Sequence, residues 1–403
     1  MNRPIRVLSL YEGFFAGGAR ILHTDVIAGL HGDNQHHGVP QQHSVLSIAS
    51  AARRDASIQH LHQDPRYLRL TEAGVDVTTL GRVGGTDPLE PSTFTERQLR
   101  MASDAVRQAD VILSLKEQPL GLLLALHERG LMPDIPVAAC LHRSDPMHSG
   151  PALSWLNQAA LTGMLTAEIS CAQSTSDAYA PFLTPATGRF VIGNGIDTDR
   201  FRPGTDAEQA ATRARFGIPA TAPVVVFAAR FDTMKDPGLF LRSAALFSQQ
   251  HPETHFLVCG AGMTLQNEAF RALLAESGVT AATHLHALGI RDDMPSIYQI
   301  ADIVALTSAF GEASPLCLLE GAASGATPVT TDVGDAAITV DGIGFVTPHD
   351  PARIAATWSG VLTGRSELRA LSLAARPRFG RDRMISEYAS AMEGLLERAR
   401  VAA

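Results

Sequence analysis

The sequence predicts an α/β protein with two domains, each built around a parallel sheet. The chain has 403 residues, which is longer than one hydrophobic core usually serves, so we expect two domains. Short apolar runs alternate with longer helical patterns along the chain, as in consecutive βαβ units. Glycine-rich turns follow some of these runs, for example at residues 11–20 and 260–262. Such turns are typical of sheets that bind ligands at the carboxyl ends of their strands.

The composition describes an ordinary globular chain, with 45% apolar and 18% charged residues. The formal net charge of −8 disfavours nucleic acid as a partner, because binding phosphates requires a basic surface. The apolar run at residues 5–10 is too short for a signal peptide, and that near 120–126 is far too short to span a membrane. The cysteines lie in apolar segments without CxxC spacing, which predicts buried, reduced thiols and a cytoplasmic protein. They are Cys140, Cys171, Cys259 and Cys317.

In the first domain we expect strands at residues 6–10, 43–48, 111–115, 135–141 and 168–172. A helix should run from the glycine-rich turn to Leu30, and Gly17 and Gly18 would let a phosphate approach its start. Residues 53–100 are expected to hold short helices and turns, with a loop at 84–92. Because loops vary within a fold, this region should select the acceptor of any reaction.

The segment at residues 31–43 contains four histidines, His31, His36, His37 and His43. A metal site is one interpretation, but the histidines lack helical or zinc-finger spacing. A polar loop before the second strand is therefore favoured.

In the second domain we expect strands at residues 223–229, 255–259, 284–288, 303–306 and 327–331. After the run at 303–306, Ser314 suits a helix N-cap, Pro315 the first helical position and Gly325 the position just after the end. The first free N–H groups, at Leu316 and Cys317, would then favour an anion or a sugar hydroxyl.

Two carboxylates flank this expected helix start. Glu312 lies in the preceding loop, and Glu320 lies four residues after Leu316, on the same helical face. A carboxylate accepts two hydroxyl hydrogen bonds, which suits a ribose or hexose diol. From spacing alone, it is equally open that neither residue binds a ligand, with Glu312 a solvated loop residue and Glu320 an exposed helix residue.

The segment FGEASPLCLLEGAASG at residues 310–325, followed by PVTTDVGD at 328–335, resembles the E-x7-E signature of retaining GT-B glycosyltransferases of family 4. Gly321 and Ser324 stand where that family often has alanine and cysteine. The resemblance is specific over residues 189–350 and weaker over 1–185. It implies the GT-B fold, with two Rossmann-like domains facing a cleft. The expected divisions are an acceptor domain at 1–197, a donor domain at 198–380, and a helix at 381–403 that returns to the first domain.

Arg230 and Lys235 lie five residues apart in the turn after the strand at 223–229, and could converge on one diphosphate. The alternative is a pair of solvated loop cations. The chain contains only two lysines, Lys116 and Lys235, which draws attention to both positions. In the family that the motif resembles, an arginine and a lysine at this turn bind the donor diphosphate.

The resemblance also implies roles for other residues. His142, at the end of the strand at 135–141, would contact the donor sugar with Glu312, while Glu320 would hold the ribose. The Asp197-Thr198-Asp199 segment is formally a DxD motif, but it resembles the family's interdomain connection, so we interpret it as a turn. The other residues expected at the donor are Gly17, Gly18, Ile290, Arg291, Ser314, Pro315 and Leu316.

The function implied is retaining transfer of a sugar from a UDP-, GDP- or ADP-linked donor to a hydroxyl acceptor, with no cofactor and no essential metal. Two alternatives stay open: a nucleotide-sugar-binding protein without transfer, and a GT-B enzyme of other chemistry, such as an epimerase. Residues 1–190 carry 15 Arg and Lys against 18 Asp and Glu. We therefore expect no stable membrane association and a soluble small molecule or saccharide as acceptor. The sequence specifies neither that acceptor nor the oligomeric state.

Overall fold

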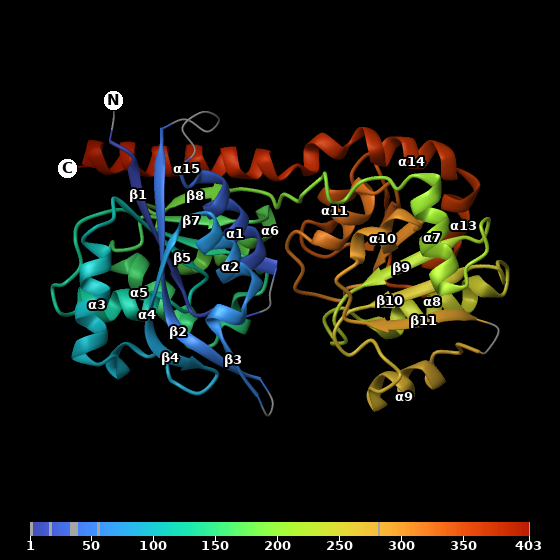
Figure 1. Ribbon diagram of the computed structural model, residues 1–403, viewed down its shortest axis with the longest axis horizontal. Helices are drawn as coiled ribbons and strands as arrows, with labels where there is room; N and C mark the ends of the chain where they lie inside the picture. Colours follow the sequence, from blue (N-terminus) through green and yellow to red (C-terminus); the bar gives the residue numbers. More distant parts are fainter. Residues whose placement is uncertain (1–2, 16–17, 33–38, 55–56, 281–282, 403) are drawn as a thin grey trace. The chain divides into compact units, whose positions relative to one another are not determined.

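The computed structural model describes residues 3–15, 18–32, 39–54, 57–280 and 283–402 (Figure 1). Its contacts divide the chain into two compact units. Unit 1 comprises Met1–Gly195 together with Arg381–Ala403, and unit 2 comprises Ile196–Gly380. Each unit is an α/β structure around a largely parallel sheet, so the predicted fold class is confirmed.

The sheet of unit 1 has the strand order β3-β2-β1-β5-β6-β7-β8, with β4 paired to β2. The β2–β3 pair is antiparallel and the other pairs are parallel. The order reverses between β1 and β5, and sheets of this kind bind ligands outside the strand ends at such a switch point. The strands are β1 (Ile5–Tyr11), β2 (Gln41–Arg54), β3 (Ser57–His60), β4 (Asp76–Gly84), β5 (Val111–Leu115), β6 (Val137–Leu141), β7 (Ala167–Ser170) and β8 (Gly188–Val191).

Helices cover both faces of this sheet because its strands are apolar on both sides (Figure 1). Leu8 and Leu10 of β1 join one core cluster with residues of α3, α4 and α5. On the opposite face, Ser9 hydrogen-bonds through Oγ to His23 Nε2 of α1 at 3.1 Å. The helices are α1 (Gly18–Leu30), α2 (Pro65–Glu72), α3 (Glu96–Val106), α4 (Leu120–His127), α5 (Ala152–Leu161), α6 (Gln173–Tyr179) and α15 (Arg381–Ala402).

The last helix, α15, packs on the α1 side of unit 1 (Figure 1). There the rings of His23 and Tyr388 are in edge contact. Its apolar stripe has the helical spacing that the sequence predicts. Met384, Ile385, Tyr388 and Met392 are all buried. The end of the chain therefore completes the core of unit 1.

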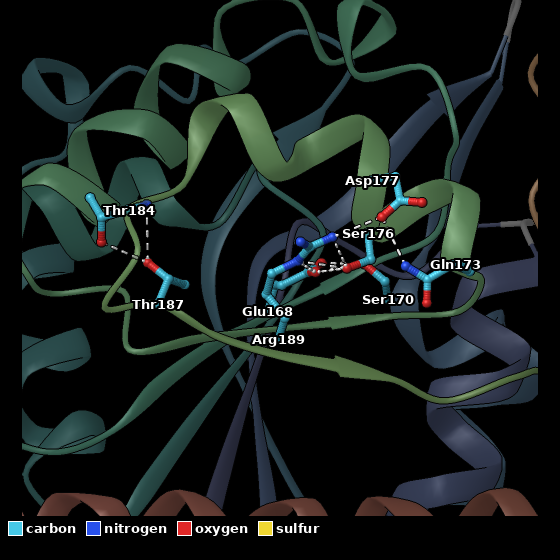
Figure 2. Close-up of polar contacts among 8 residues, drawn as sticks. All are labelled: Glu168, Ser170, Gln173, Ser176, Asp177, Thr184, Thr187 and Arg189. Carbon is cyan, nitrogen blue, oxygen red and sulfur yellow. Dashed lines mark hydrogen bonds and ion pairs between the residues drawn. The ribbon is translucent and has the colours of Figure 1, made fainter.

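A buried polar network ties three elements of unit 1 together (Figure 2). The fully buried Glu168 of β7 accepts hydrogen bonds from Ser170 and from Ser176 of α6. Arg189 of β8 forms an ion pair with Glu168 at 3.3 Å and another with Asp177 at 3.1 Å. Because a buried carboxylate is costly without partners, this network fixes α6 against the last two strands.

The sheet of unit 2 is entirely parallel, with the order β11-β10-β9-β12-β13-β14 and a switch point between β9 and β12. Val224 and Val226 of β9 pack with α10 and α11, while Val225 and Phe227 pack with α8, α9 and α13. The strands are β9 (Val224–Ala228), β10 (His255–Cys259), β11 (His284–Gly289), β12 (Ile303–Leu306), β13 (Thr327–Thr331) and β14 (Phe345–Thr347). The helices are α7 (Asp206–Phe216), α8 (Pro237–Ser248), α9 (Glu268–Glu276), α10 (Met294–Gln299), α11 (Leu316–Ala323), α12 (Ala336–Val340), α13 (Pro351–Thr363) and α14 (Arg365–Ala374).

Two expectations about local structure were wrong. Residues 53–100 contain the strands β3 and β4, which sequence patterning missed because β4 has few apolar positions and is interrupted by Gly81 at φ +81°. Helix α11 begins one residue later than predicted, so Pro315, and not Ser314, occupies the N-cap position with an extended φ/ψ of −74°/114°. The N–H of Asp335 donates to the carbonyl of Ala313 at 3.0 Å, which holds the chain in a loop up to this point.

The four cysteines are free thiols; three are buried and Cys317 is half-buried. No helix in the described part of the chain is both long and apolar enough to cross a membrane.

Candidate active site

Two loops meet at the switch point of unit 2. Lys235 lies in the loop after β9, and Glu312 lies in the loop after the neighbouring strand β12. The Lys235 ammonium forms an ion pair with Glu312 Oε1, and Ser308 Oγ donates to the same oxygen. The side chain of Lys235 is 16% exposed and that of Glu312 is 5% exposed. The structure thus places a cation and a carboxylate together at the carboxyl ends of adjacent strands.

The backbone of both loops is tightly held. Asp236 adopts a left-handed φ of 39°, and its carboxylate caps α8 by accepting from the N–H of Leu239 at 2.9 Å. Thr307 Oγ1 donates to the carbonyl of Asp236 at 3.0 Å, which joins the loop after β9 to the end of β12. Gly334 has φ +60°, and a Cβ there would lie 2.1 Å from the carbonyl oxygen of Glu312. Only glycine fits this close approach.

Sequence reasoning did not select Ser308, Thr307 or Gly334 as site residues. Gly334 was nevertheless visible as the glycine of the PVTTDVGD segment. The signal available in the sequence was a glycine shortly after an expected strand, within the segment that resembles the family motif. The two hydroxyl residues offered none, because their role depends on which strands are neighbours.

Arg230 lies in the same loop as Lys235 but has a different partner. Its side chain is 67% exposed and forms an ion pair with Asp232 at 3.0 Å. The structure therefore shows two cations on one loop with separate partners. Their convergence on a diphosphate remains a prediction.

Glu320 lies on α11 and is half-buried. Burial raises the pKa of its carboxyl to about 7, and this effect outweighs a hydrogen bond from Tyr298 and the charge of Arg200, which lower the pKa. Glu320 therefore exchanges its proton near neutral pH. As a carboxylate it is able to accept hydrogen bonds from ligand hydroxyls.

Ile290 and Arg291 follow β11 directly. Ile290 is 79% exposed. The Arg291 guanidinium donates two hydrogen bonds to Asp293, from Nε to Oδ1 at 2.7 Å and from Nη2 to Oδ2 at 2.8 Å. These bonds raise the pKa of Arg291. The side chain of Arg291 is thus engaged in positioning its own loop, and a base contact would fall to backbone groups.

The remaining predicted residues lie at helix starts or in unit 1. Ser314 and Pro315 precede α11, and Leu316 is its first residue. Gly18 is the first residue of α1, whereas Gly17 lies outside the described residues.

His142 follows β6 in unit 1 and is half-buried. No residue in the described part of the chain hydrogen-bonds its buried Nε2 atom. Burial, together with the charges of Lys116 and His23, lowers the pKa of His142 to about 3, so its imidazole is neutral at physiological pH. A neutral ring carries one N–H donor and one acceptor, either of which suits a sugar hydroxyl.

The two segments that suggested metal ligands show other contacts. Asp197 Oδ1 accepts from the N–H groups of Asp199 at 3.1 Å and Arg200 at 3.0 Å, which is the turn chemistry that the sequence indicates. The N–H of His43 donates to His31 Nδ1 at 3.1 Å. Residues 33–38, which include His36 and His37, lie outside the described residues. Within the ranges that are described, no three His, Cys, Asp or Glu side chains are arranged to hold a metal ion.

Comparison with known proteins supports the family resemblance. Residues 222–363 match the family described as glycosyl transferases group 1. The D-inositol 3-phosphate glycosyltransferase of Corynebacterium kroppenstedtii is 33% identical over 177 residues, which are 40% of this chain and 38% of that protein. The match thus spans less than two fifths of the length of this curated relative.

Among solved structures, Anabaena HepE in complex with UDP matches with a TM-score of 0.76 and 17% identity, over 97% of this chain and 100% of that chain. HepE in complex with UDP-glucose gives a TM-score of 0.72, also at 17% identity, over 97% and 99%. At this identity the likeness establishes the fold. The chain therefore has the GT-B fold, and its residues 222–363 match the family of glycosyl transferases group 1.

Proposed function

We propose that this protein transfers a glycosyl group from a nucleoside diphosphate sugar to a hydroxyl group of an acceptor, with retention of configuration at the anomeric carbon. The Lys235–Glu312 pair at the switch point of unit 2 carries this proposal. A cation suited to a diphosphate and a carboxylate suited to sugar hydroxyls lie side by side on adjacent loops. Both residues fall within the segment that matches the group 1 family.

Lys235 would act on the leaving group. As the bond between the anomeric carbon and the phosphate oxygen breaks, negative charge grows on the diphosphate, and a preorganised cation stabilises it. Arg230, which is exposed on the same loop, would leave Asp232 and add a forked contact. Glu312 and the neutral His142 would orient the sugar, and Glu320 would accept from the ribose hydroxyls.

The route that we propose is a same-face substitution. The acceptor oxygen bonds to the anomeric carbon on the face from which the diphosphate departs. The acceptor proton passes to an oxygen of that diphosphate, so the products are the glycoside and a nucleoside diphosphate. No covalent intermediate with the protein is required.

For the donor we propose a UDP-sugar, ahead of GDP- or ADP-linked sugars. HepE, which shares the fold, has been solved in complex with UDP and with UDP-glucose. In this chain the base would lie against the backbone after β11, at Ile290 and Arg291. Ile290, the first residue of that loop, is exposed.

A thermal-shift panel of UDP-glucose, UDP-N-acetylglucosamine, GDP-mannose and ADP-glucose tests the donor. A ligand at 100 times its dissociation constant stabilises the folded protein by about 2.7 kcal/mol. Transfer is then measured as the nucleoside diphosphate that is released when a candidate acceptor is added. NMR of the product gives the anomeric configuration. Binding of every donor without turnover would favour a nucleotide-sugar-binding protein, and an isomerised donor in the absence of acceptor would favour an epimerase.

A further inference from the structure

Asp236, the residue directly after Lys235, has an unusual backbone conformation. Its φ and ψ are 39° and 67°, in the left-handed region that residues with a side chain seldom occupy. Within the described ranges, only one other residue besides the glycines, Lys116, has a positive φ. Strained residues of this kind persist where surrounding contacts hold them, and they are concentrated at functional sites. The conformation of Asp236 therefore depends on the contacts around it.

Capping a helix does not account for this conformation. Asp236 is the N-cap of α8, and an N-cap residue usually has an extended backbone. Asp350 caps α13 of the same unit in that ordinary way, with φ −140° and ψ 122°, and accepts from the N–H of Arg353 at 2.8 Å. Because an aspartate caps a helix without a left-handed turn, the turn at Asp236 has another cause.

Contacts from three elements hold Asp236 in this conformation. Its Oδ1 atom accepts from the N–H of Leu239 at 2.9 Å, and its Oδ2 atom lies 2.9 Å from Nε2 of His349. Because a carboxylate only accepts, Nε2 is the nitrogen that donates the proton in this contact. The carbonyl of Asp236 accepts from Thr307 Oγ1 at 3.0 Å. His349 lies in the loop after β14 and Thr307 directly after β12, so the turn is tied to the ends of two other strands.

The same turn fixes the backbone of Lys235. Thr307 Oγ1 also lies 3.3 Å from the carbonyl of Lys235, so two successive carbonyls share one hydroxyl. Both carbonyls face this hydroxyl because of the left-handed turn between them. On the other side, the N–H of Lys235 donates to Asp232 Oδ1 at 3.2 Å. The peptide groups before and after Lys235 are thus held, and its side chain reaches Glu312 from a defined backbone position.

We propose that Asp236, held by His349, is a positioning residue for Lys235 and so sets how strongly the protein binds a nucleoside diphosphate. The proposal rests on the function proposed above, in which Lys235 binds the donor diphosphate. Asp236 acts through the backbone, since its carboxylate is occupied by Leu239 and His349.

The charge of Asp236 and its positioning role have opposite effects on binding. A negative charge next to Lys235 opposes a bound diphosphate, so charge alone predicts tighter binding when the carboxylate is removed. Positioning predicts weaker binding, because the backbone of Lys235 loses its support. The direction of the change therefore separates the two effects.

The affinity of the full chain for UDP relative to uridine, measured by isothermal titration, tests the proposal because this ratio isolates the contribution of the diphosphate. We expect Asp236→Ala to lower the ratio at least about tenfold, since alanine loses both carboxylate contacts and disfavours a positive φ. Asp236→Gly should lower it less, because glycine adopts this φ without strain. In a Lys235→Ala background, Asp236→Ala should have little further effect, because Asp236 acts through that lysine.

His349 provides the same test from a side chain that is 47% exposed, where a substitution disturbs folding least. His349→Ala should lower the ratio at least about threefold, whereas His349→Gln keeps an N–H donor and should stay within about twofold of the native protein. Thr205→Ala is the control, because it removes the N-cap of α7 in the same unit and should leave the ratio unchanged. Thermal unfolding of each variant shows whether it is folded, and the ratio is compared among folded variants.

A ratio that depends on Lys235 but on neither Asp236 nor His349 would overturn the positioning role and leave the proposed function intact. A ratio that rises in Asp236→Ala would show that only the charge matters, and would also overturn it. Equal losses in Thr205→Ala and His349→Ala would mean that these contacts contribute to stability alone. A native protein that binds UDP no more tightly than uridine would refute the diphosphate site at Lys235, and this proposal with it.

Discussion

Glu320→Gln should make the stability of unit 2 less dependent on pH. Its folded pKa of about 7 lies above the ordinary value of 4.5. The folded state therefore holds this proton more tightly than the unfolded state does. Protonated Glu320 contributes stability that is complete below pH 4.5 and is lost as the pH rises through 7. The difference between the two pKa values corresponds to about 3 kcal/mol at most.

Glutamine is neutral at every pH and has nearly the same shape. We therefore expect the free energy of unfolding of the variant to exceed that of the native protein by less than about 1 kcal/mol at pH 5 and by about 3 kcal/mol at pH 8. Urea unfolding between pH 5 and pH 8, followed by tryptophan fluorescence, measures this difference. Trp358 is fully buried in unit 2. A Trp155→Phe background removes the other tryptophan, so the signal reports on unit 2 alone.

The matched control is Glu367→Gln, an exposed glutamate on α14 of the same unit. The free energy of unfolding of this control should vary with pH in the same way as that of the native protein. The same pH dependence for Glu320→Gln would refute the raised pKa. A variant that is less stable at every pH would instead mean that the carboxylate contributes to folding as an ion.

The same residue should affect nucleotide binding. If Glu320 accepts both ribose hydroxyls as a carboxylate, UDP binding should weaken about tenfold for each pH unit below 7. Binding of 2′,3′-dideoxy-UDP, measured in parallel, should hardly change with pH or with Glu320→Gln, because it lacks the donor hydroxyls. Equal pH slopes for the two nucleotides would exclude this role.

Three further outcomes are expected. Lys235→Ala should lower kcat/KM at least about tenfold, or about 1.4 kcal/mol, and should weaken the binding of UDP more than that of uridine. Arg353→Ala, at an exposed position of the same unit, should change neither kcat/KM nor binding. Gly334→Ala places a Cβ 2.1 Å from the carbonyl oxygen of Glu312, so it should reduce kcat/KM more than Gly342→Ala, which has a similar φ and nothing within 4 Å. Equal losses for the two alanines would show that the contact is unimportant. The protein should not sediment with anionic vesicles at low salt, and salt-reversible pelleting would contradict that expectation.

The sequence predicted strands best where an apolar run is short and sharply bounded. The expected bounds at residues 111–115, 255–259, 303–306 and 327–331 are those of β5, β10, β12 and β13. In β4 only Val77, Leu80 and Val83 are apolar side chains, and the buried positions are those of Leu80 and Arg82. Its pairing with β2 is decided by tertiary contacts, which a local pattern does not contain.

For the candidate site, single residues were accessible from the sequence and their partners were not. Lys235 and Glu312 stood out through spacing and resemblance, but their ion pair spans 77 residues. It exists because β9 and β12 are neighbours, which only the strand order specifies. Likewise, the pKa of Glu320 depends on burial and on Tyr298 from α10, neither of which its own helix reveals.

The placement of α15 has a consequence for the order in which the chain folds during synthesis. Unit 1 is split in the sequence, whereas unit 2 is continuous. Met384, Tyr388 and Met392 leave the ribosome only after the whole of unit 2, and until then the α1 face of the first sheet lacks its apolar cover. Domains usually fold from the N-terminus onward as they emerge. Here the unit that is begun first is completed last, and unit 2 is free to fold before it.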